Sequence, residues 1–360
     1  MLPKWFNDWN RENPTDIYGP AIIVGTAVGA VLVAALIVTW GQPFATDSLQ
    51  TGPRGTGMSV PEFDTERKAP DPTIADYASS DPVVPESGAA LAVDTYENVP
   101  PALANLTVEN YDRLLAAMRT WTGIPDLLDD PDSYQTKVAY RMIEMTQNIN
   151  ENWDAHVNAN EVVGVNCFTC HRGQVVPSDI WFRITPVTQS SSGWSAVQNQ
   201  ATSLSQFTSL PSDALEAYLL NYEVIGVHSL DSRVDEPPAS GDYPTWQNAE
   251  RTYSFMNYIS NSLGVNCVFC HNSRAFYDAG QVTPQWATET LGIGMVQELN
   301  EEYLVPLRDD YPEDRLGPIY ADAPKAACRT CHKGYQQPLQ GLNMIDDWPE
   351  LATTEVPEYE

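Results

Sequence analysis

Three copies of one short pattern contain all six cysteines of the chain, and each copy ends in histidine. They read CFTCH at 167–171, CVFCH at 267–271 and CRTCH at 328–332. On a helical turn, positions i, i+3 and i+4 share one face, so the thiols and the imidazole of a copy can face one planar ligand. Two thiols can then bond the vinyl groups of a porphyrin while the imidazole meets its iron, and C-x-x-C-H is the attachment pattern of c-type haem.

The pattern predicts three covalently bound haem c groups, one for each copy. The thiols that would form the covalent bonds are Cys167, Cys170, Cys267, Cys270, Cys328 and Cys331. The imidazoles that would bind the irons are those of His171, His271 and His332. Zinc also binds paired cysteines, but a zinc site takes four ligands and needs no histidine directly after each pair. A redox dithiol does not need that histidine either, so the repeated histidine favours haem.

Each iron also needs a ligand on its second side. A haem closed there by Met or His transfers electrons, whereas an open iron binds gases or reacts. Met256 lies 11 residues before the second copy and is the candidate there, with core packing as the alternative. Before the first copy, Met142 and Met145 share one helical face, and the spacing does not choose between them. His156 follows that helix closely, whereas His228 is predicted to be an ordinary loop histidine.

Apolar residues at helical spacing predict the elements that hold these ligands. Helices are expected at 106–121, from the N-cap Ser133 onward, at 247–263 and at 287–307. The apolar faces of the middle two consist of Tyr134, Val138, Met142, Met145, Ile149 and Trp153, and of Ala249, Tyr253, Met256, Ile259 and Leu263. A methionine-bearing helix, a turn and a CxxCH copy thus occur twice, which indicates an internal duplication. The expected fold is mainly α, a multihaem cytochrome c with two pseudo-repeated helix–CxxCH halves and long irregular loops.

Residues 21–40 form an apolar run of 20 residues without a charge, which matches a helix that crosses the hydrocarbon core. The run exceeds the about 7–15 apolar residues of a secretory signal, and Tyr18 and Trp40 flank it as interfacial aromatics do. Gly25 and Gly29 form a face that suits packing on another membrane helix, although simple anchoring explains the run equally well.

The expected organisation follows from this helix and from the motifs. Because c-type haem is attached outside the cytoplasm, the residues after position 41 are expected in the periplasm. Lys4 and Arg11 before the helix agree with the excess of basic residues on the cytoplasmic side of membrane helices. The parts are a cytoplasmic head at 1–18, a transmembrane helix at 19–41, an extended periplasmic arm at 42–105, a triheme domain at 106–345 and an acidic tail at 346–360.

The chain is strongly acidic, with 19 Lys and Arg against 48 Asp and Glu and a net charge of -29. Such a surface repels nucleic acid and anionic lipid headgroups, and it attracts basic partners by long-range steering. The alternative is that the charge serves only solubility.

Longer strings around the copies carry a family resemblance. They are QTGPRGTGM at 50–58, YQTKVAYRMIEMTQNINENWDAHV followed by GVNCFTCHRGQ, SLGVNCVFCHN with Met256 before it, and CRTCHKG. Over nearly its whole length the chain resembles the c-type cytochrome subunit of purple-bacterial photosynthetic reaction centres. The resemblance implies that Met142 and His171 bind one iron, and that Met256 and His271 bind another. His156 would reach across to the third iron, opposite His332. Met145 remains the alternative to Met142, because the chain is about three residues longer than the family between His156 and the first copy.

The chain departs from the family at one place. Similar proteins carry four haems, but the region of their first motif reads RLLAAMRTWTGIPDLLDDPDS here, without cysteine or histidine, and Leu115 replaces the usual methionine. The resemblance therefore implies three haems, with the outermost of a linear row missing. The haem on Cys167 and Cys170 would then accept electrons first, and the haem on Cys267 and Cys270 would lie nearest the chlorophyll pair. Trp286 also replaces a basic residue of the family.

The resemblance implies an electron carrier rather than an enzyme, with no catalytic residues. Electrons would pass from a soluble periplasmic carrier through three haems to the photo-oxidised bacteriochlorophyll special pair. The implied partners are the reaction-centre L, M and H subunits and a soluble cytochrome c or similar basic donor, with light-harvesting 1 subunits as further neighbours and no nucleic acid. The implied location is the inner, photosynthetic membrane. The alternatives are a membrane-anchored respiratory multihaem cytochrome and a haem reductase, which would need a five-coordinate iron.

Overall fold

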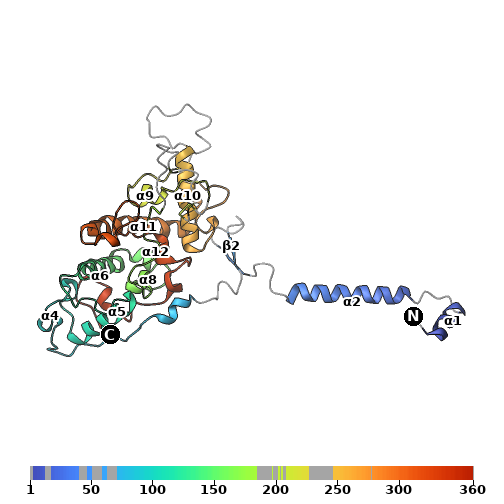
Figure 1. The fold of residues 1–360 in the computed structure, drawn as a ribbon, viewed down its shortest axis with the longest axis horizontal. Coiled ribbons are helices and arrows are strands. Elements are labelled where there is room, and N and C mark those ends of the chain that lie inside the picture. Colours follow the sequence, from blue (N-terminus) through green and yellow to red (C-terminus); the bar gives the residue numbers. More distant parts are fainter. Residues whose placement is uncertain are drawn as a thin grey trace. The chain divides into compact units, whose positions relative to one another are not determined.

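The computed structural model describes residues 3–12, 18–39, 47–50, 59–62, 71–184, 208–226, 246–276 and 278–359, together with 197, 202 and 204–205. Across these residues the chain is mainly helical (Figure 1), which confirms the expected fold class. His228 and residues 51–58 of the QTGPRGTGM string lie outside the described residues. The chain divides into two compact units, residues 1–49 with 61–69 and residues 50–60 with 70–360.

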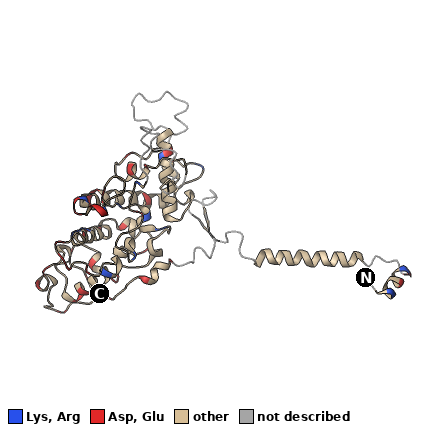
Figure 2. Cartoon of the chain, in the orientation of Figure 1, with Lys and Arg blue, Asp and Glu red and all other residues tan. Residues whose placement is uncertain are grey.

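The N-terminal unit contains α1 (Lys4–Glu12) and α2 (Tyr18–Thr39). The strands β1 (Asp47–Gln50) and β2 (Ser59–Glu62) pair in a two-stranded sheet. Helix α2 has 22 residues, its most apolar stretch has a mean hydropathy of 2.8, and none of its residues is buried. Figure 2 shows no charged residue along it. It is long and apolar enough to cross a membrane, which fits the expected membrane anchor.

The larger unit, called the haem unit below, consists of helices joined by irregular segments. Its α-helices are α4 (Ala92–Thr95), α5 (Val108–Thr122), α6 (Tyr134–Asn152), α7 (Asp154–Val157), α8 (Cys167–His171), α9 (Ala214–Leu219), α10 (Trp246–Leu263), α11 (Pro284–Glu298) and α12 (Cys328–His332). A π-helical turn, η7, covers Leu299–Leu304. The 3-10 turns are η1 (Pro72–Asp76), η2 (Pro101–Leu103), η5 (Cys267–Phe269), η6 (Ala279–Gln281), η8 (Val305–Asp309), η9 (Glu313–Arg315), η10 (Pro338–Gly341) and η11 (Pro349–Leu351).

The long helices start and stop for local reasons. Ser133 accepts a hydrogen bond from the Thr136 amide (3.2 Å), so the predicted N-cap of α6 is confirmed. The helix predicted at 287–307 begins earlier, at Pro284, and ends at Glu298. Proline suits the first turn of a helix. Further on, Pro306 has no N–H to donate, and the α-helical pattern changes to π-helical and 3-10 turns before and around it.

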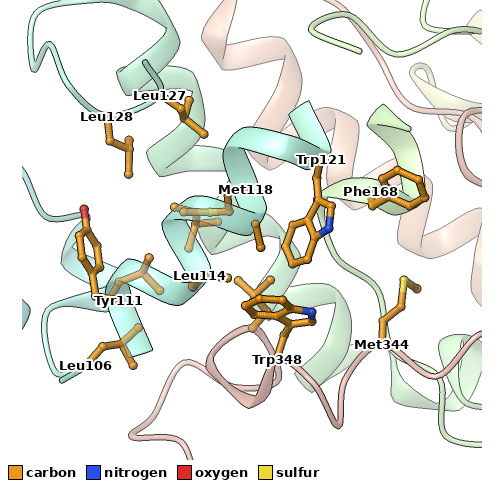
Figure 3. Close-up of a cluster of buried hydrophobic side chains, with 14 of the residues drawn as sticks. Leu106, Tyr111, Leu114, Met118, Trp121, Leu127, Leu128, Phe168, Met344 and Trp348 are labelled. Atoms are coloured by element: carbon orange, nitrogen blue, oxygen red, sulfur yellow. The ribbon is translucent and has the colours of Figure 1, made fainter. Parts of the chain in front are cut away.

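A first core surrounds α5 (Figure 3). Trp121 stacks on Tyr77 with ring centroids 6.0 Å apart and meets Trp348 edge-on at 4.7 Å. Arg113, also on α5, lies 4.3 Å above the Trp348 ring and pairs with the buried carboxylate of Glu350 at 2.5 Å. The segment before α5 and the C-terminal segment are therefore both packed onto this helix. We call the part of the haem unit that is built around α5 the first half.

A second core joins α9, α10, α11 and α12. Its buried side chains include Tyr218 and Leu219 of α9, Phe255 and Ile259 of α10, and Val296 of α11. The polar rim contains Arg251, Asp213 and Glu223, which form two ion pairs that are only partly buried. We call the part that is built around α10 the second half. Like the first half, it has a central helix with motif turns around it, but its ion pairs are more exposed.

Candidate haem centres

The first and third motifs each form a single helical turn, α8 and α12, as their spacing predicts. Asn166 caps α8 by accepting from the Phe168 amide (2.9 Å), and the Thr169 hydroxyl accepts from the Asn166 amide (3.1 Å). In α12 the Thr330 hydroxyl accepts from the amide before the motif in the same way (2.9 Å). The threonine between the cysteines thus closes the turn in both motifs, so cysteines and histidine are held on one turn.

The second motif is less regular. Only its first three residues form a 3-10 turn, η5, and His271 is held by a bond from its amide to the Cys267 carbonyl (3.0 Å). Thr283, directly before α11, donates its hydroxyl to the Phe269 carbonyl (2.7 Å) and its amide to the Cys270 carbonyl (3.1 Å). The start of α11 therefore holds the second motif.

Two of the three motif imidazoles are oriented through a hydrogen bond from Nδ1. His171 donates from Nδ1 to the Gln174 carbonyl (2.8 Å), and His332 to the Tyr335 carbonyl (3.1 Å). Burial lowers the pKa of His171, and burial with the nearby His156 lowers the pKa of His332 to about 4. Burial also lowers the pKa of His271. The rings are therefore neutral near pH 7, and in His171 and His332 Nε2 is left for iron.

The helix–motif packing occurs twice, but not in the pairing that the similar strings suggest. The Gly173 amide, after the first motif, donates to the Trp121 carbonyl near the end of α5 (2.8 Å). The Gly334 amide, after the third motif, donates to the Ser262 carbonyl near the end of α10 (2.8 Å). The structural counterpart of the first motif is therefore the third motif, although the second is closer to it in sequence.

Two glycines allow this close packing. Gly123 and Gly264 end α5 and α10 with the same positive φ of 66°. A Cβ at Gly123 would lie 2.5 Å from the Gly173 carbonyl oxygen, and a Cβ at Gly264 would overlap the Gly334 carbonyl oxygen. We call these the glycine contacts of the first and second halves. Each permits the end of a long helix to touch the turn after a motif histidine.

The third motif is adjacent to both of the others. The Sγ atoms of Cys170 and Cys331 lie 2.7 Å apart, so the first and third motifs are in contact. Gly264, three residues before Cys267, lies against the carbonyl of Gly334, two residues after His332, so the third motif is also close to the second. Burial first, and the charge of Glu289 second, raise the pKa values of the Cys270 and Cys328 thiols, that of Cys270 to about 12. Haems bound to these three motifs would therefore form a row, with the haem of the third motif in the middle.

His156 lies opposite His332, where the family resemblance predicts a second iron ligand. It belongs to the short helix α7, and its ring centroid is 6.3 Å from that of His332 with the planes at 70°. An iron bound by two imidazole nitrogens at about 2 Å each, as for other metal–nitrogen bonds, separates the ring centroids by roughly 6 Å. The Nδ1 atom of His156 donates to the Thr288 carbonyl (2.8 Å), and burial lowers the pKa of the ring. The pair fits an iron between the two rings.

The methionine candidates are half-buried. The side of α6 that packs against protein carries Thr136, Ile143, Gln147 and Asn150, whereas Met142 and Met145 lie beside it and remain partly exposed. Of the apolar face predicted for α6, Ile149 is therefore buried, and the other residues are only partly buried. Met256 is half-buried against the second core. Met256 thus packs against a cluster that includes Cys328 of the third motif, whereas the partial burial of Met142 and Met145 does not distinguish between them.

Several neighbours of the motifs carry no signal in the cysteine pattern. Thr288 and Gly292 of α11 contact His156, and only the two glycines in LGIGM, unusual inside a helix, hint at it. Among the described residues, the buried Trp153 Nε1 and Arg172 Nη2 atoms have no hydrogen-bond partner. Such donors suit an anionic group, and haem carries two carboxylates. Glu289 is the other residue that the sequence analysis missed.

The place where a further motif would stand is packed with leucines. Gly264 is followed by VNCVFCH, whereas its counterpart Gly123 is followed by IPDLLDD. Leu127 and Leu128 of this loop are 3% and 5% exposed and belong to the first core around α5 (Figure 3). The Leu128 carbonyl also accepts from the Asn98 side chain (2.6 Å). The loop is an integral part of the protein core.

Three CxxCH motifs, two of them on a helical turn with the imidazole held through Nδ1, are typical of multihaem c-type cytochromes. A family model described as photosynthetic reaction centre cytochrome C subunit matches residues 41–352. The chain is 60% identical to the photosynthetic reaction center cytochrome c subunit of Roseobacter denitrificans, with both chains covered completely. It is 35% identical to that of Rubrivivax gelatinosus (92% of this chain, 90% of the relative) and 34% identical to that of Thermochromatium tepidum (94% and 81%). The chain belongs to the family of photosynthetic reaction-centre cytochrome c subunits.

Proposed function

We propose that this protein is the electron-transfer subunit of a photosynthetic reaction centre. It accepts electrons from a soluble periplasmic carrier and passes them through three c-type haems to the photo-oxidised bacteriochlorophyll special pair. Haem supplies the one-electron redox chemistry; the protein supplies attachment, axial ligands, burial and orientation. The observation that carries the proposal is the adjacency of the third motif to the other two, through the Cys170–Cys331 contact and through the contact of Gly264 with Gly334.

The order of transfer is inferred from that adjacency and from the family. Electrons enter at the haem on Cys167 and Cys170, pass to the haem on Cys328 and Cys331, and leave from the haem on Cys267 and Cys270. A direct step between the first and second motifs is less favourable, because the third motif contacts the first at Cys170 and lies next to the second at Gly264.

The proposed axial ligands are His171 with Met142, His271 with Met256, and His332 with His156. Methionine raises the potential of a haem relative to a second histidine, so the middle haem has the lowest potential. Support for the histidine pair comes from the ring separation of 6.3 Å and from the carbonyl bonds that leave each Nε2 for iron. Met145 is the alternative partner of His171.

The proposed number of haems is three. In the first half, the loop after Gly123 offers Leu127 and Leu128 to the core in place of cysteines and histidine. The packing of these leucines in the first core around α5 supports the absence of a haem there.

The proposed location is the photosynthetic membrane, with α2 as the anchor and the haem unit in the periplasm. The proposed partners are the L, M and H subunits with the special pair, light-harvesting 1 subunits, and a basic soluble cytochrome c or similar donor. The net charge of -29 supports a basic donor. The second-order rate of electron transfer from such a donor is expected to fall as salt is added.

A pyridine haemochrome assay on the purified full-length protein tests the proposal. Three covalent haems per chain are expected, and two or four would overturn the assignment. Co-purification with bacteriochlorophyll is expected for a reaction-centre subunit, whereas a respiratory cytochrome would purify without it. Stoichiometric binding of carbon monoxide to the ferrous protein would instead indicate an open iron and a haem reductase.

A further inference from the structure

The imidazole of His156 rests on one face of α11. Its Nδ1 atom donates to the carbonyl of Thr288 (2.8 Å). Gly292 lies four residues further along, on the same side of the helix. A Cβ added at Gly292 would stand 2.9 Å from Nδ1 and 3.0 Å from Nε2 of His156, and closer still to Cε1. Real Cβ atoms do not approach a ring so closely, so the ring can occupy this place only because position 292 is glycine.

The carbonyl of Thr288 fixes the ring in a second way. A backbone carbonyl has two lone pairs, so it can accept from a side chain in addition to its bond within the helix. A bond to a carbonyl requires the proton of His156 to be on Nδ1, which leaves Nε2 unprotonated and able to bind a metal. Gly292 limits how close the ring lies to α11, and the Thr288 carbonyl limits its rotation. His332 is held similarly by the Tyr335 carbonyl (3.1 Å).

We propose that Gly292 and the Thr288 carbonyl form a seat that sets the plane of the His156 imidazole against that of His332. Gly292 is then a positioning residue for the haem between them. The proposal rests on the proposed function, in which both imidazoles bind the iron of the haem on Cys328 and Cys331. The planes stand at 70°. The angle between two imidazole planes sets the splitting of the iron d orbitals, so near-perpendicular rings give a strongly anisotropic low-spin ferric signal in electron paramagnetic resonance.

The first test compares the full-length wild-type protein with Gly292→Ala and with the matched control Gly294→Ala. The control adds the same methyl to the same helix. Its Cβ would meet only the edge of the Trp153 ring at 3.2 Å. All three proteins are expected to hold equal numbers of covalent haems. In Gly292→Ala the anisotropic signal is expected to be lost or shifted, one haem is expected to rise in potential, and one ferrous haem per chain is expected to bind carbon monoxide. Gly294→Ala is expected to match the wild type.

The second test remains informative even if Gly292→Ala does not fold. His156→Gly removes the ring, so His156→Gly and the double variant with Gly292→Ala both lack the overlap. Added imidazole is expected to bind His156→Gly and to restore the anisotropic signal, because its N–H can donate to the Thr288 carbonyl. The double variant is expected to bind imidazole at least tenfold more weakly, or with a changed signal.

The outcomes separate this inference from the proposed function. A wild-type protein without a bis-imidazole haem would refute the ligand assignment itself. A wild-type protein with that haem, together with an unchanged signal and potential in Gly292→Ala, would overturn the seat alone. Equal imidazole affinity and equal signals in the His156→Gly single and double variants would overturn it as well.

Discussion

The two halves of the haem unit share a way of packing a helix on a motif turn and differ in the segment that the helix leads into. In both, a glycine with φ of 66° ends the long helix and touches the turn after a motif histidine. In the second half that glycine leads into a CxxCH motif, whereas in the first half it leads into a leucine loop. The glycine contact is present in the first half even though no CxxCH motif follows Gly123 there. Its role is therefore to hold the motif that precedes Gly173 in the first half and the motif that precedes Gly334 in the second.

The halves also differ in how deeply their central charges are buried. The side chains of Arg113 and Glu350 in the first half are 8% and 0% exposed, whereas those of Arg251 and Asp213 in the second are both 15% exposed. Arg113 also donates to the carbonyls of Ser80 and Asp347 (2.7 Å each). The first half, in which no CxxCH motif follows the central helix, thus has the more deeply buried ion pair.

The largest expected effect comes from breaking that ion pair. Arg113→Ala leaves a buried Glu350 carboxylate without its cation, which costs about 3–5 kcal/mol of unfolding free energy. Arg251→Ala removes partly solvated pairs and is expected to cost about 1 kcal/mol or less. Urea unfolding of the holoprotein, with the exposed Arg308→Ala as the control, measures both losses. Equal losses for Arg113→Ala and Arg251→Ala would contradict the difference between the halves.

The next largest effect is expected from substitutions in the leucine loop, the segment IPDLLDD that follows Gly123. Leu127→Ala and Leu128→Ala each remove a buried side chain from the first core, which costs about 2–5 kcal/mol. The haem count is expected to stay at three, because the loop stabilises the fold and binds no haem. Leu291→Ala, at a position 40% exposed on α11, is the control and is expected to lose little stability. Unchanged thermal and urea midpoints in Leu127→Ala would show that the loop is not part of the core.

Local features of the fold were predictable from the sequence. The CxxCH turns, the Ser133 cap and the approximate bounds of α5, α6 and α10 depend on spacing within one helix or turn. The helix near 287–307 was predicted with wrong bounds, because a periodic pattern does not show where Pro306 ends α-helical hydrogen bonding.

The relation between distant segments was not predictable from patterns. Two nearly identical strings suggested that the first and second motifs are equivalent, yet the packing relates the first motif to the third. His156 was placed opposite His332 only through the family resemblance. The Thr288 carbonyl has no sequence signal at all, since every residue has a carbonyl. Gly292 could have been noticed as a glycine that a helix interior disfavours.

The glycine contacts distinguish the halves by which haem they disturb. Gly123→Ala and Gly264→Ala both place a side chain at positive φ and against a carbonyl, with a cost of about 1–3 kcal/mol from backbone strain. Gly123→Ala is expected to shift only the potential of the haem on Cys167 and Cys170. Gly264→Ala is expected to shift both haems of the second half, because the residue also leads into the second motif. Redox titration resolved by haem measures this.

A matched control for the glycine contacts exists. Gly88 also has a positive φ, of 83°, but a Cβ there would meet nothing within 4 Å. Gly88→Ala is therefore expected to lose stability through backbone strain alone, with all three potentials unchanged. If Gly123→Ala shifted every haem equally, the contacts would not act locally.

The smallest expected effect comes from the charge of Glu289 near the second and third motifs. A hydrogen bond with Cys331 first, and then the charges of Lys333 and Arg172, lower the pKa of the Cys170 thiol, and the same two cations act on Cys331 of the third motif. The charge of Glu289 acts on Cys270 of the second motif and on Cys328 of the third, and burial raises the pKa of Glu289 to about 7. As pH rises through 7, Glu289 loses its proton, and its negative charge stabilises the ferric state of the nearby haems. Their potentials are expected to fall with a slope below about 59 mV per pH unit, the limit for one proton coupled to one electron.

Glu289→Gln provides the decisive comparison, because it keeps the shape of the side chain and removes its titration. Potentiometric titrations between pH 5 and pH 9 are expected to show the slope of the second and third haems disappear in Glu289→Gln, with the first haem unchanged. The same proton predicts stability. Because the folded protein holds it between the ordinary glutamate pKa and pH 7, unfolding free energy should fall as pH rises through that range, and less so in the variant. A slope confined to the first haem would place the coupled carboxylate elsewhere and remove this distinction between the motifs.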